Sequence, residues 1–430
     1  MISRLIKYYF SLLYWDRASL RSVKKMQLKK FRKIFEYART NSKFYKDLYT
    51  KYGVMDLKIE SWDDVEKVPI VNKLMLRDYE SKDIVTCGIN DKINLHTTSG
   101  SSGEPLKLYF DKFADYTSHT RVFFALFKIA AYNPFKKITL ITRYEEKDNF
   151  QVEGDLSFLK KLQKRFGLFQ REIISVYSDP DFIIEKIIKS KPYLLWSTPS
   201  VIEIVANRLV EKGISLNVPY LYFTSEHLNQ IQYEKFKKYI SSNIVDIYGS
   251  MESPCLGFEL NKSGKRTVYP NSNMFELINE RNFENQYVGD VVITNFINFS
   301  MPIIRYDLKD LCEIKNDENI PHKYISPIIG RIDDILQFLD GKQFVHHHAH
   351  EMFMDFEECE QFKFIQILNQ NIILQLKPNK KYSLDEIELK AQNRWNKRFE
   401  KYPLIIEFVD KFEINPKTGK FKNIEKISSL

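Results

Sequence analysis

A regular alternation of β-rich runs and amphipathic helical patterns fills the middle of the chain, from Ile138 to Gly249. The predicted strands are Ile138 to Thr142, Ile173 to Tyr177, Tyr193 to Thr198, Tyr220 to Thr224 and Ile244 to Tyr248. Between them, one helical face is shared by Ile183, Ile184, Ile187 and Ile188, and another by Tyr233, Phe236 and Ile240. Such alternation predicts an α/β protein with a doubly wound, mainly parallel sheet.

The pattern changes twice after this region. Strand-like runs dominate from Val268 to Ile314, at Met274 to Ile278, Val288 to Phe296 and Pro302 to Tyr306. An α+β pattern follows Gly330, with strands at Ile335 to Leu339, Lys363 to Leu368, Ile372 to Leu376 and Leu404 to Val409 and a helix at Leu384 to Phe399. We therefore predict a large N-terminal domain, a β-rich segment included, over residues 1–330, and a small C-terminal α+β domain over residues 331–430.

Composition excludes several classes of protein. The chain is 43% hydrophobic and 28% charged, which is typical of folded globular domains. The net charge of +9 is modest for 430 residues, and without a base-reading module we expect no nucleic-acid partner. The four cysteines form no C-x-x-C pair, so free thiols in a reducing cytoplasm are expected. No apolar run reaches the roughly 18 residues of a transmembrane helix, and no signal-peptide pattern is present.

The N-terminal stretch from Ile2 to Trp15 has a helical pattern with two interpretations. Its apolar residues are Ile2, Leu5, Ile6, Tyr9, Phe10 and Leu13, with Arg4 and Lys7 between them. An amphipathic helix of this kind can pack on its own domain, which is the interpretation we favour. The alternative is a peripheral contact with the inner face of a membrane.

A run of small residues, Thr98-Ser99-Gly100-Ser101-Ser102-Gly103-Glu104-Pro105, follows Ile93 to His96 and precedes a predicted apolar strand at Leu106 to Phe110. Small residues let the backbone approach a polyphosphate closely, and hydroxyls and N–H groups donate to its oxygens. The G-K-S/T ending of a Walker loop is missing. Because Gly/Ser runs are also typical of flexible linkers, this run alone leaves the two interpretations open.

This run resembles the T-S-G-S/T-S/T-G-x-P loop of the adenylate-forming ligases, and further motifs of that family follow in order. They are Thr224-Ser225-Glu226, the Y-G-x-S/T-E-like segment Asp246 to Glu252, Gly289 to Thr294 with Pro302 to Asp310, the hinge-like Gly330 to Asp334, and Pro416 to Lys420. Lys309 before Asp310, and the opening run Gln27 to Tyr49, resemble the phenylacetate–CoA ligase-like proteins, including the CapK group of capsular polysaccharide biosynthesis.

The resemblance implies an enzyme that uses ATP and Mg²⁺ to convert a carboxylic acid into an acyl-adenylate, releasing pyrophosphate. The acyl group would then pass to CoA, a carrier thiol or an amino-sugar acceptor, within cell-surface polysaccharide biosynthesis. A small-molecule carboxylate is therefore the expected substrate, and CoA is one expected acceptor.

The resemblance also assigns roles to individual residues. The phosphates would be held by Thr98, Ser99, Gly100, Ser101, Ser102 and Gly103, and the rest of the nucleotide by Glu226, Tyr248, Gly249, Asp310 and Arg331. Glu252 would bind Mg²⁺, a hard cation that prefers carboxylate oxygen. Lys420, with Glu252 and Arg331, would be catalytic, and Asp333 would be the hinge on which the small domain turns.

Several of these residues have simpler alternatives. Tyr248-Gly249 could be a strand end and turn, Glu226 a helix cap and Lys420 a solvated lysine. Arg305 and Asp310 could form a surface ion pair.

Two positions depart from the family pattern. Met251 replaces the usual Thr or Ser beside the acidic residue, so adenylation could be slower or the metal held differently. A catalytically lapsed nucleotide-binding homologue, acting as a binding or scaffold protein, is therefore the alternative function. After the hinge, only Gly341-Lys342 approximates the usual glycine followed by a basic residue.

The cluster His346-His347-His348-Ala349-His350 raises the question of a metal site. Adjacent histidines diverge on helix and strand alike, so we expect a surface or pocket-lining role instead. No second Cys and no His lies between Cys255 and Tyr269 to complete a zinc site, so we predict no structural zinc.

Overall fold

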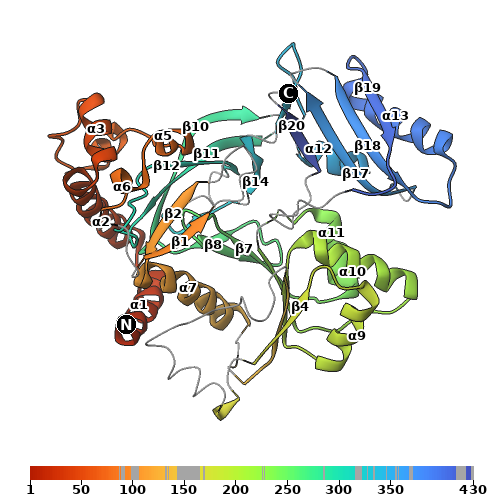
Figure 1. Ribbon diagram of the computed structural model, residues 1–430, viewed down its shortest axis with the longest axis horizontal. Coiled ribbons are helices and arrows are strands. Elements are labelled where there is room, and N and C mark those ends of the chain that lie inside the picture. Colours follow the sequence, from red (N-terminus) through yellow and green to blue (C-terminus); the bar gives the residue numbers. More distant parts are fainter. Residues whose placement is uncertain are drawn as a thin grey trace. The chain divides into compact units, whose positions relative to one another are not determined.

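The computed structural model describes the chain apart from residues 87, 89–92, 98–105, 131–132, 134, 143–164, 168–169, 225, 227, 284–285, 315–321, 327, 333–334, 345, 354–355, 357, 368–370, 413–422 and 428–430. The chain divides into two compact units (Figure 1). The first comprises Met1–Leu228, Tyr233–Leu308 and Cys312–Pro327, and the second comprises Asn229–Gln232, Lys309–Leu311 and Ile328–Leu430. No helix of the described residues is long and apolar enough to cross a membrane.

The first unit is built on an eight-stranded sheet in the order β13-β9-β8-β7-β6-β5-β3-β4. Its parallel strands are β3 (Ile138–Thr142), β4 (Arg171–Ser175), β5 (Leu194–Ser197), β6 (Tyr220–Thr224) and β7 (Ile244–Tyr248). Antiparallel strands extend it: β8 (Gly257–Leu260), β9 (Arg266–Val268) and β13 (Tyr324–Ile325). The predicted α/β class with a mainly parallel sheet is confirmed, and β3, β6 and β7 have the predicted bounds.

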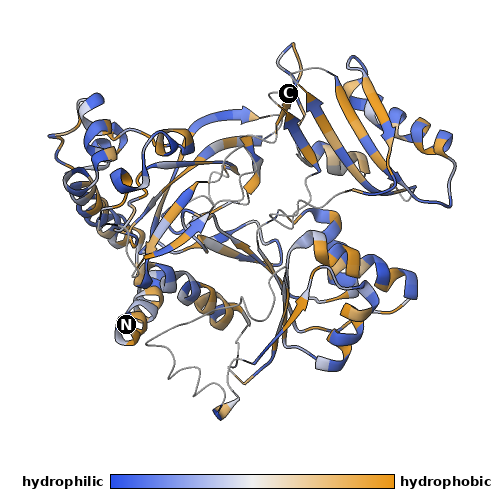
Figure 2. Cartoon of the chain, in the orientation of Figure 1, coloured by the Kyte–Doolittle hydropathy of each residue, from blue (hydrophilic) through white to orange (hydrophobic). Residues whose placement is uncertain are grey.

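Helices cover both faces of this sheet. One face packs against α9 (Pro180–Ser190), α10 (Pro199–Lys212) and α11 (Gln230–Tyr239), and the other against α1 (Ile2–Arg17) and α7 (Lys112–Ala130). The covering helices are apolar on one side and polar on the other (Figure 2). Ile183, Ile184 and Ile187 are buried as predicted, but Ile188 is 52% exposed, so it does not share their face.

A second sheet has the order β10-β11-β12-β14, formed by β10 (Asn273–Phe283), β11 (Gln286–Asn295), β12 (Tyr306–Glu313) and β14 (Ile328–Arg331). The prediction of a strand at Pro302 to Tyr306 is wrong, because the strand begins at Tyr306. Pro302 has no N–H to donate, and Arg305 has a φ of 45°, in the left-handed region that interrupts an extended chain.

A hairpin flanks the run of small residues. Strands β1 (Ile93–Thr97) and β2 (Lys107–Asp111) are antiparallel, and Thr97 pairs with Lys107. The remaining helices of the first unit are α2 (Leu20–Asn41), α3 (Lys43–Lys51), α4 (Trp62–Lys67), α5 (Lys73–Arg77) and α6 (Ser81–Ile84).

The second unit contains a four-stranded sheet in the order β19-β18-β17-β20. The strands are β17 (Cys359–Ile367), β18 (Ile372–Pro378), β19 (Leu404–Phe408) and β20 (Ile424–Ile427), and a two-stranded ribbon pairs β15 (Leu336–Gln337) with β16 (Gln343–Phe344). Helix α13 (Leu384–Phe399) has the predicted bounds and is capped by Ser383, whose side chain accepts from the Glu386 N–H. It buries Ile387, Ala391, Trp395 and Phe399 in the core of this unit.

The histidine cluster lies on a helix that the sequence pattern did not predict, α12 (His346–Phe353). His348 is only 1% exposed and packs against Phe344 and Phe399, with ring centroids 5.6 and 5.3 Å away. The expected surface or pocket-lining role is therefore wrong for His348, which belongs to the core. Among the described residues, no group of three or more His, Cys, Asp or Glu side chains is placed to hold a metal.

Candidate active site

The structure describes six of the predicted site residues: Glu226, Tyr248, Gly249, Glu252, Asp310 and Arg331. The others lie outside the described residues, namely Thr98, Ser99, Gly100, Ser101, Ser102, Gly103, Asp333 and Lys420. The six described residues lie in the turns that follow β6 and β7 and in the pair formed by Asp310 and Arg331.

A tight turn follows β7 and carries the Y-G-S-M-E segment. Its ends are joined by a hydrogen bond of 2.8 Å from the Leu256 N–H to the Tyr248 carbonyl. A Cβ atom on Gly249 would lie 2.7 Å from the Cys255 nitrogen, so only glycine fits here without displacing the backbone. The glycine of this segment thus allows the chain to fold back closely behind the strand end.

Glu252 is the buried acidic residue of this turn, with 8% of its surface exposed. Its carbonyl accepts from Asn295 Nδ2 at 3.3 Å, and the neighbouring Ser253 hydroxyl donates to Asn273 Oδ1 at 2.7 Å. Both contacts fix the backbone around it. In the part of the chain that the structure describes, the Glu252 carboxylate itself has no hydrogen-bond or ion-pair partner.

A carboxylate in this state fits a cation site. The Glu252 oxygens are not among the fully buried, unpaired polar atoms of the described residues, so they stay accessible to a cation. Mg²⁺ in nucleotide sites is held by one or two carboxylates together with phosphate oxygens, so a cluster of acidic residues is not required. The donor set around Glu252 therefore suits a nucleotide-bound Mg²⁺.

Met251 lies beside this carboxylate and is 37% exposed. The hydroxyl of Ser250, the residue before Met251, accepts from the Ser253 N–H at 3.2 Å and so stabilises the turn. The position where the family carries a hydroxyl is thus occupied by an exposed thioether.

Tyr248 ends β7 with a half-buried ring. The Arg266 guanidinium carbon lies 5.3 Å from the centre of that ring, and Arg266 is held in turn by Asp246 and, at 3.6 Å, by Glu259. A buried cation therefore supports the ring of Tyr248, which was predicted to bind the nucleotide.

Glu226 follows β6, the parallel neighbour of β7. Its two carboxylate oxygens accept from the Ser200 N–H and from the Ser200 hydroxyl, both at 3.0 Å, at the first turn of α10. These contacts are those of the helix-cap alternative. A role in nucleotide binding stays a prediction for Glu226.

Asp310 and Arg331, both assigned to nucleotide binding, form an ion pair in the second unit. Arg331 Nε lies 3.3 Å from Asp310 Oδ1, between the neighbouring strands β12 and β14. The alternative of a surface pair between Arg305 and Asp310 is wrong. Arg305 is 5% exposed, and its Nε and Nη2 lie 3.0 and 2.9 Å from Glu276 Oε1.

Arg121 is a residue of this region that no motif predicted. It lies on α7, is 2% exposed, and donates through Nε to the Cys255 carbonyl at 2.9 Å and through Nη2 to the Pro254 carbonyl. It therefore holds the far end of the turn that carries Glu252. The signal in the sequence was a single arginine directly before a mainly apolar stretch, Val122 to Ala131.

Two histidines of the first unit should make its stability depend on pH. Burial lowers the pKa of His119 and of His322 to about 4. Both pKa values lie below that of histidine in the unfolded chain, about 6.5. The two histidines therefore make their full contribution to the free energy of unfolding above that pH, and this contribution is lost as the pH falls toward 4. Each shift corresponds to roughly 3 kcal/mol.

Urea unfolding of the protein near pH 7.5 and near pH 5 measures this loss. For each additional proton that the unfolded chain binds, the free energy of unfolding falls by about 1.4 kcal/mol per pH unit. The double variant His119→Gln and His322→Gln should show a smaller difference between the two conditions than the unchanged protein. An equal difference in both proteins would contradict the assignment to these histidines.

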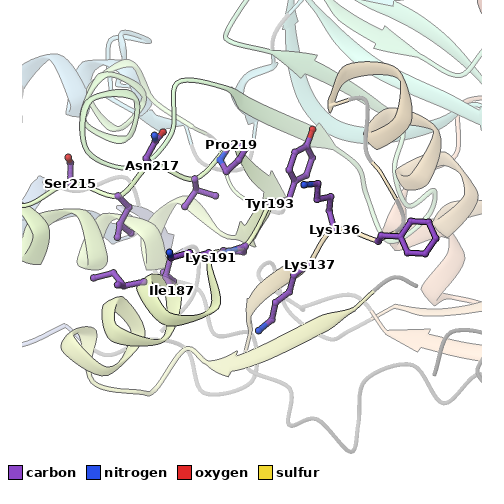
Figure 3. A pocket seen from close by; sticks show the side chains of 13 residues that line it. Lys136, Lys137, Ile187, Lys191, Tyr193, Ser215, Asn217 and Pro219 are labelled. Atoms are coloured by element: carbon purple, nitrogen blue, oxygen red, sulfur yellow. The ribbon is translucent and has the colours of Figure 1, made fainter. Parts of the chain in front are cut away.

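A pocket of about 490 Å³ lies elsewhere in the first unit (Figure 3). Its residues include Lys136 and Lys137 just before β3, Tyr193 just before β5 and Pro219 just before β6, so it lies at the amino ends of the parallel strands. Glu226 and Tyr248 lie at the opposite, carboxyl ends. Lys136, Lys137 and Lys191 point in different directions (Figure 3), and Lys137 pairs with Glu172 at 3.1 Å. The pocket is therefore separate from the candidate active site.

No protein-family model matches this chain. Curated relatives are nevertheless similar over most of its length. CapK of Staphylococcus aureus is 24% identical over 327 residues, which cover 73% of this chain and 68% of CapK. Phenylacetate-coenzyme A ligase of Escherichia coli K12 is 21% identical over 392 residues, which cover 88% of this chain and 84% of that enzyme.

Solved structures share the fold. 2-Hydroxyisobutyryl-CoA ligase, in the postadenylation state in complex with R3-HIB-AMP, has a TM-score of 0.71 at 17% identity, over 94% of this chain and 89% of that one. ATP-bound MatB from Rhodopseudomonas palustris has a TM-score of 0.53 at 13% identity, over 75% of this chain and 65% of that one.

These likenesses confirm the predicted class: the chain has the fold of the adenylate-forming ligases. The similarity to CapK and to the phenylacetate-coenzyme A ligases agrees with the resemblance that the motifs indicated.

Proposed function

We propose that this protein is an ATP-dependent, AMP-forming carboxylate ligase, which transfers the activated acyl group to CoA or to another thiol or amine. The observation that carries the proposal is Glu252, a largely buried residue whose accessible carboxylate has no partner among the described residues, in a turn that Gly249 and Arg121 hold behind β7. The similarity to phenylacetate-coenzyme A ligases and the fold shared with CoA ligases support it.

The proposed reaction has two steps. An oxygen of the substrate carboxylate attacks the α-phosphorus of ATP, the bond to the bridging oxygen breaks, and pyrophosphate leaves with its electron pair. A thiol or amine then attacks the acyl carbon, loses its proton, and AMP leaves. Both steps develop negative charge, which fixed cations and N–H donors stabilise.

Four of the described residues would contact the nucleotide or its metal ion in this proposal. Tyr248, supported by Arg266, would offer its ring to the adenine, and Asp310 would accept hydrogen bonds from the ribose hydroxyls. Arg331, which lies beside Asp310, would contact the ribose or phosphate region. Glu252 would hold Mg²⁺, which supplies charge neutralisation on the leaving pyrophosphate when bound.

The remaining tasks fall on residues outside the described part of the chain. We propose that the serine-rich run, Ser99 to Gly103, binds the β- and γ-phosphates, and that Lys420 stabilises the charge on the α-phosphate and carboxylate. Residues 331–430 would form the mobile domain, with Asp333 as its hinge. The similarity to CapK supports a role in cell-surface polysaccharide assembly.

ATP–pyrophosphate exchange with a panel of carboxylic acids tests the proposal. We expect exchange with at least one acid and a loss of at least about a hundredfold in Lys420→Ala, because a charge that stabilises the transition state is removed. Lys411→Ala, which changes an exposed lysine nine residues earlier in the sequence, is the matched control and should retain activity. Binding of ATP without exchange for any acid would support the alternative, a catalytically lapsed homologue.

A further inference from the structure

Helix α1 is fixed to the first unit along one side. Tyr8 and Leu12 are 7% and 2% exposed, and the Tyr8 hydroxyl contacts Ser272 Oγ and accepts from Arg121 Nη1 at 3.1 Å. Asp16 pairs with Lys128 of α7. The favoured prediction, a helix packed on its own domain, is confirmed for this side.

The opposite side of α1 exposes three large apolar side chains. Ile6, Phe10 and Tyr14 follow one another at four-residue spacing and are 51%, 63% and 63% exposed. At about 100° per residue, Ser3, Lys7 and Arg17 fall within the same arc of about 100°. These six residues, all exposed, are named the α1 outer face: Ser3, Ile6, Lys7, Phe10, Tyr14 and Arg17.

The charge of the N-terminal segment that contains this face is strongly one-sided. The first 35 residues contain ten Lys or Arg and one acidic residue, Asp16, so the other 395 residues contain 55 of each sign. The whole excess of +9 is therefore concentrated in α1 and most of α2. The single acidic group is neutralised by Lys128. The α1 outer face itself carries two cations and no carboxylate.

We propose that the α1 outer face binds an anionic lipid surface. Aliphatic and aromatic side chains of an amphipathic helix enter the boundary between headgroups and acyl chains, while neighbouring cations attract the acidic headgroups. A second copy of the chain is a poorer partner, because pairing two such faces would bring the concentrated positive charges of both copies together. The proposal is independent of the ligase reaction.

Vesicle co-sedimentation of the full chain tests this proposal. We expect binding to phosphatidylcholine vesicles that contain phosphatidylglycerol, weakened by salt. The triple variant Ile6→Ser, Phe10→Ser and Tyr14→Ser should bind these vesicles at least about tenfold more weakly, because the apolar contribution is lost. Leu389→Ser, which changes a 64% exposed residue of α13, is the matched control and should bind like the unchanged protein.

A second variant, Lys7→Glu with Arg17→Glu, examines the charge. Each cation lost should weaken binding by about fivefold, so a combined effect of at least about tenfold is expected. Equal unfolding midpoints in urea verify that all variants fold.

Three results would overturn the proposal: no binding to the acidic vesicles, unchanged binding of the triple variant, or unchanged binding of the charge variant. A dimer in sedimentation equilibrium that the triple variant abolishes, together with absent vesicle binding, would assign the face to a second copy of the chain instead.

Discussion

Replacement of Glu252 by glutamine is expected to lower ATP–pyrophosphate exchange by about a hundredfold or more while the protein stays folded. The amide keeps the shape of the side chain but removes the negative charge that attracts a divalent cation. The carboxylate has no protein partner among the described residues, so the change breaks no described hydrogen bond. The free energy of unfolding should therefore change little, because no described contact is lost.

The Mg²⁺ dependence separates this role from a structural one. Glu252→Gln should need a higher Mg²⁺ concentration for half-maximal exchange, while Glu185→Gln, at an exposed position of α9, should behave like the unchanged protein. An unchanged Mg²⁺ dependence in Glu252→Gln, at any level of activity, would argue against a metal role.

Replacement of Arg305 by methionine is expected to destabilise the first unit by about 3–5 kcal/mol, the cost of leaving a buried charge without its partner. Arg305 pairs with Glu276 of β10 and also donates to the carbonyls of Glu66, at 2.7 Å, and Val68. Burial raises the pKa of Glu276, and the Arg305 guanidinium opposes that rise. Without Arg305 the pKa should rise further.

The pH dependence of the Arg305→Met variant follows from the raised pKa of Glu276. An acid with a raised folded-state pKa favours the folded chain at low pH and loses that contribution as the pH rises. The destabilisation, measured by urea unfolding relative to the unchanged protein, should therefore be larger near pH 8 than near pH 5. The double variant with Glu276→Met should be less destabilised than Arg305→Met alone. A double variant as unstable as the sum of both single changes would contradict a direct pair.

Much of the fold was predictable because its signals are local. The strands β3, β6 and β7 and helix α13 have the bounds that hydrophobic periodicity predicted. The turn after β7 was predictable from a motif, since Gly249 is needed where the chain passes Cys255. In these cases neighbours in the sequence are sufficient to define the local structure.

Contacts between distant residues were not predictable in this way. A surface pair with Asp310 was the simpler alternative for Arg305, yet its carboxylate partner, Glu276, lies 29 residues away in the chain and Arg305 is buried. The role of Arg121 depends on carbonyls more than 130 residues further along, at Pro254 and Cys255. His348 became a core residue because α12, which no pattern indicated, packs against α13. The sequence pattern of one segment does not show which other segment will pack against it.

The capping of α10 by Glu226 restricts how the protein can recognise an anion. The amino end of a helix carries partial positive charge and unsatisfied N–H groups, which make it a common binding site for phosphate. At α10 the protein's own carboxylate already takes the Ser200 N–H and hydroxyl. Any triphosphate arriving at this edge of the sheet would have to displace that carboxylate or find its donors elsewhere in the chain.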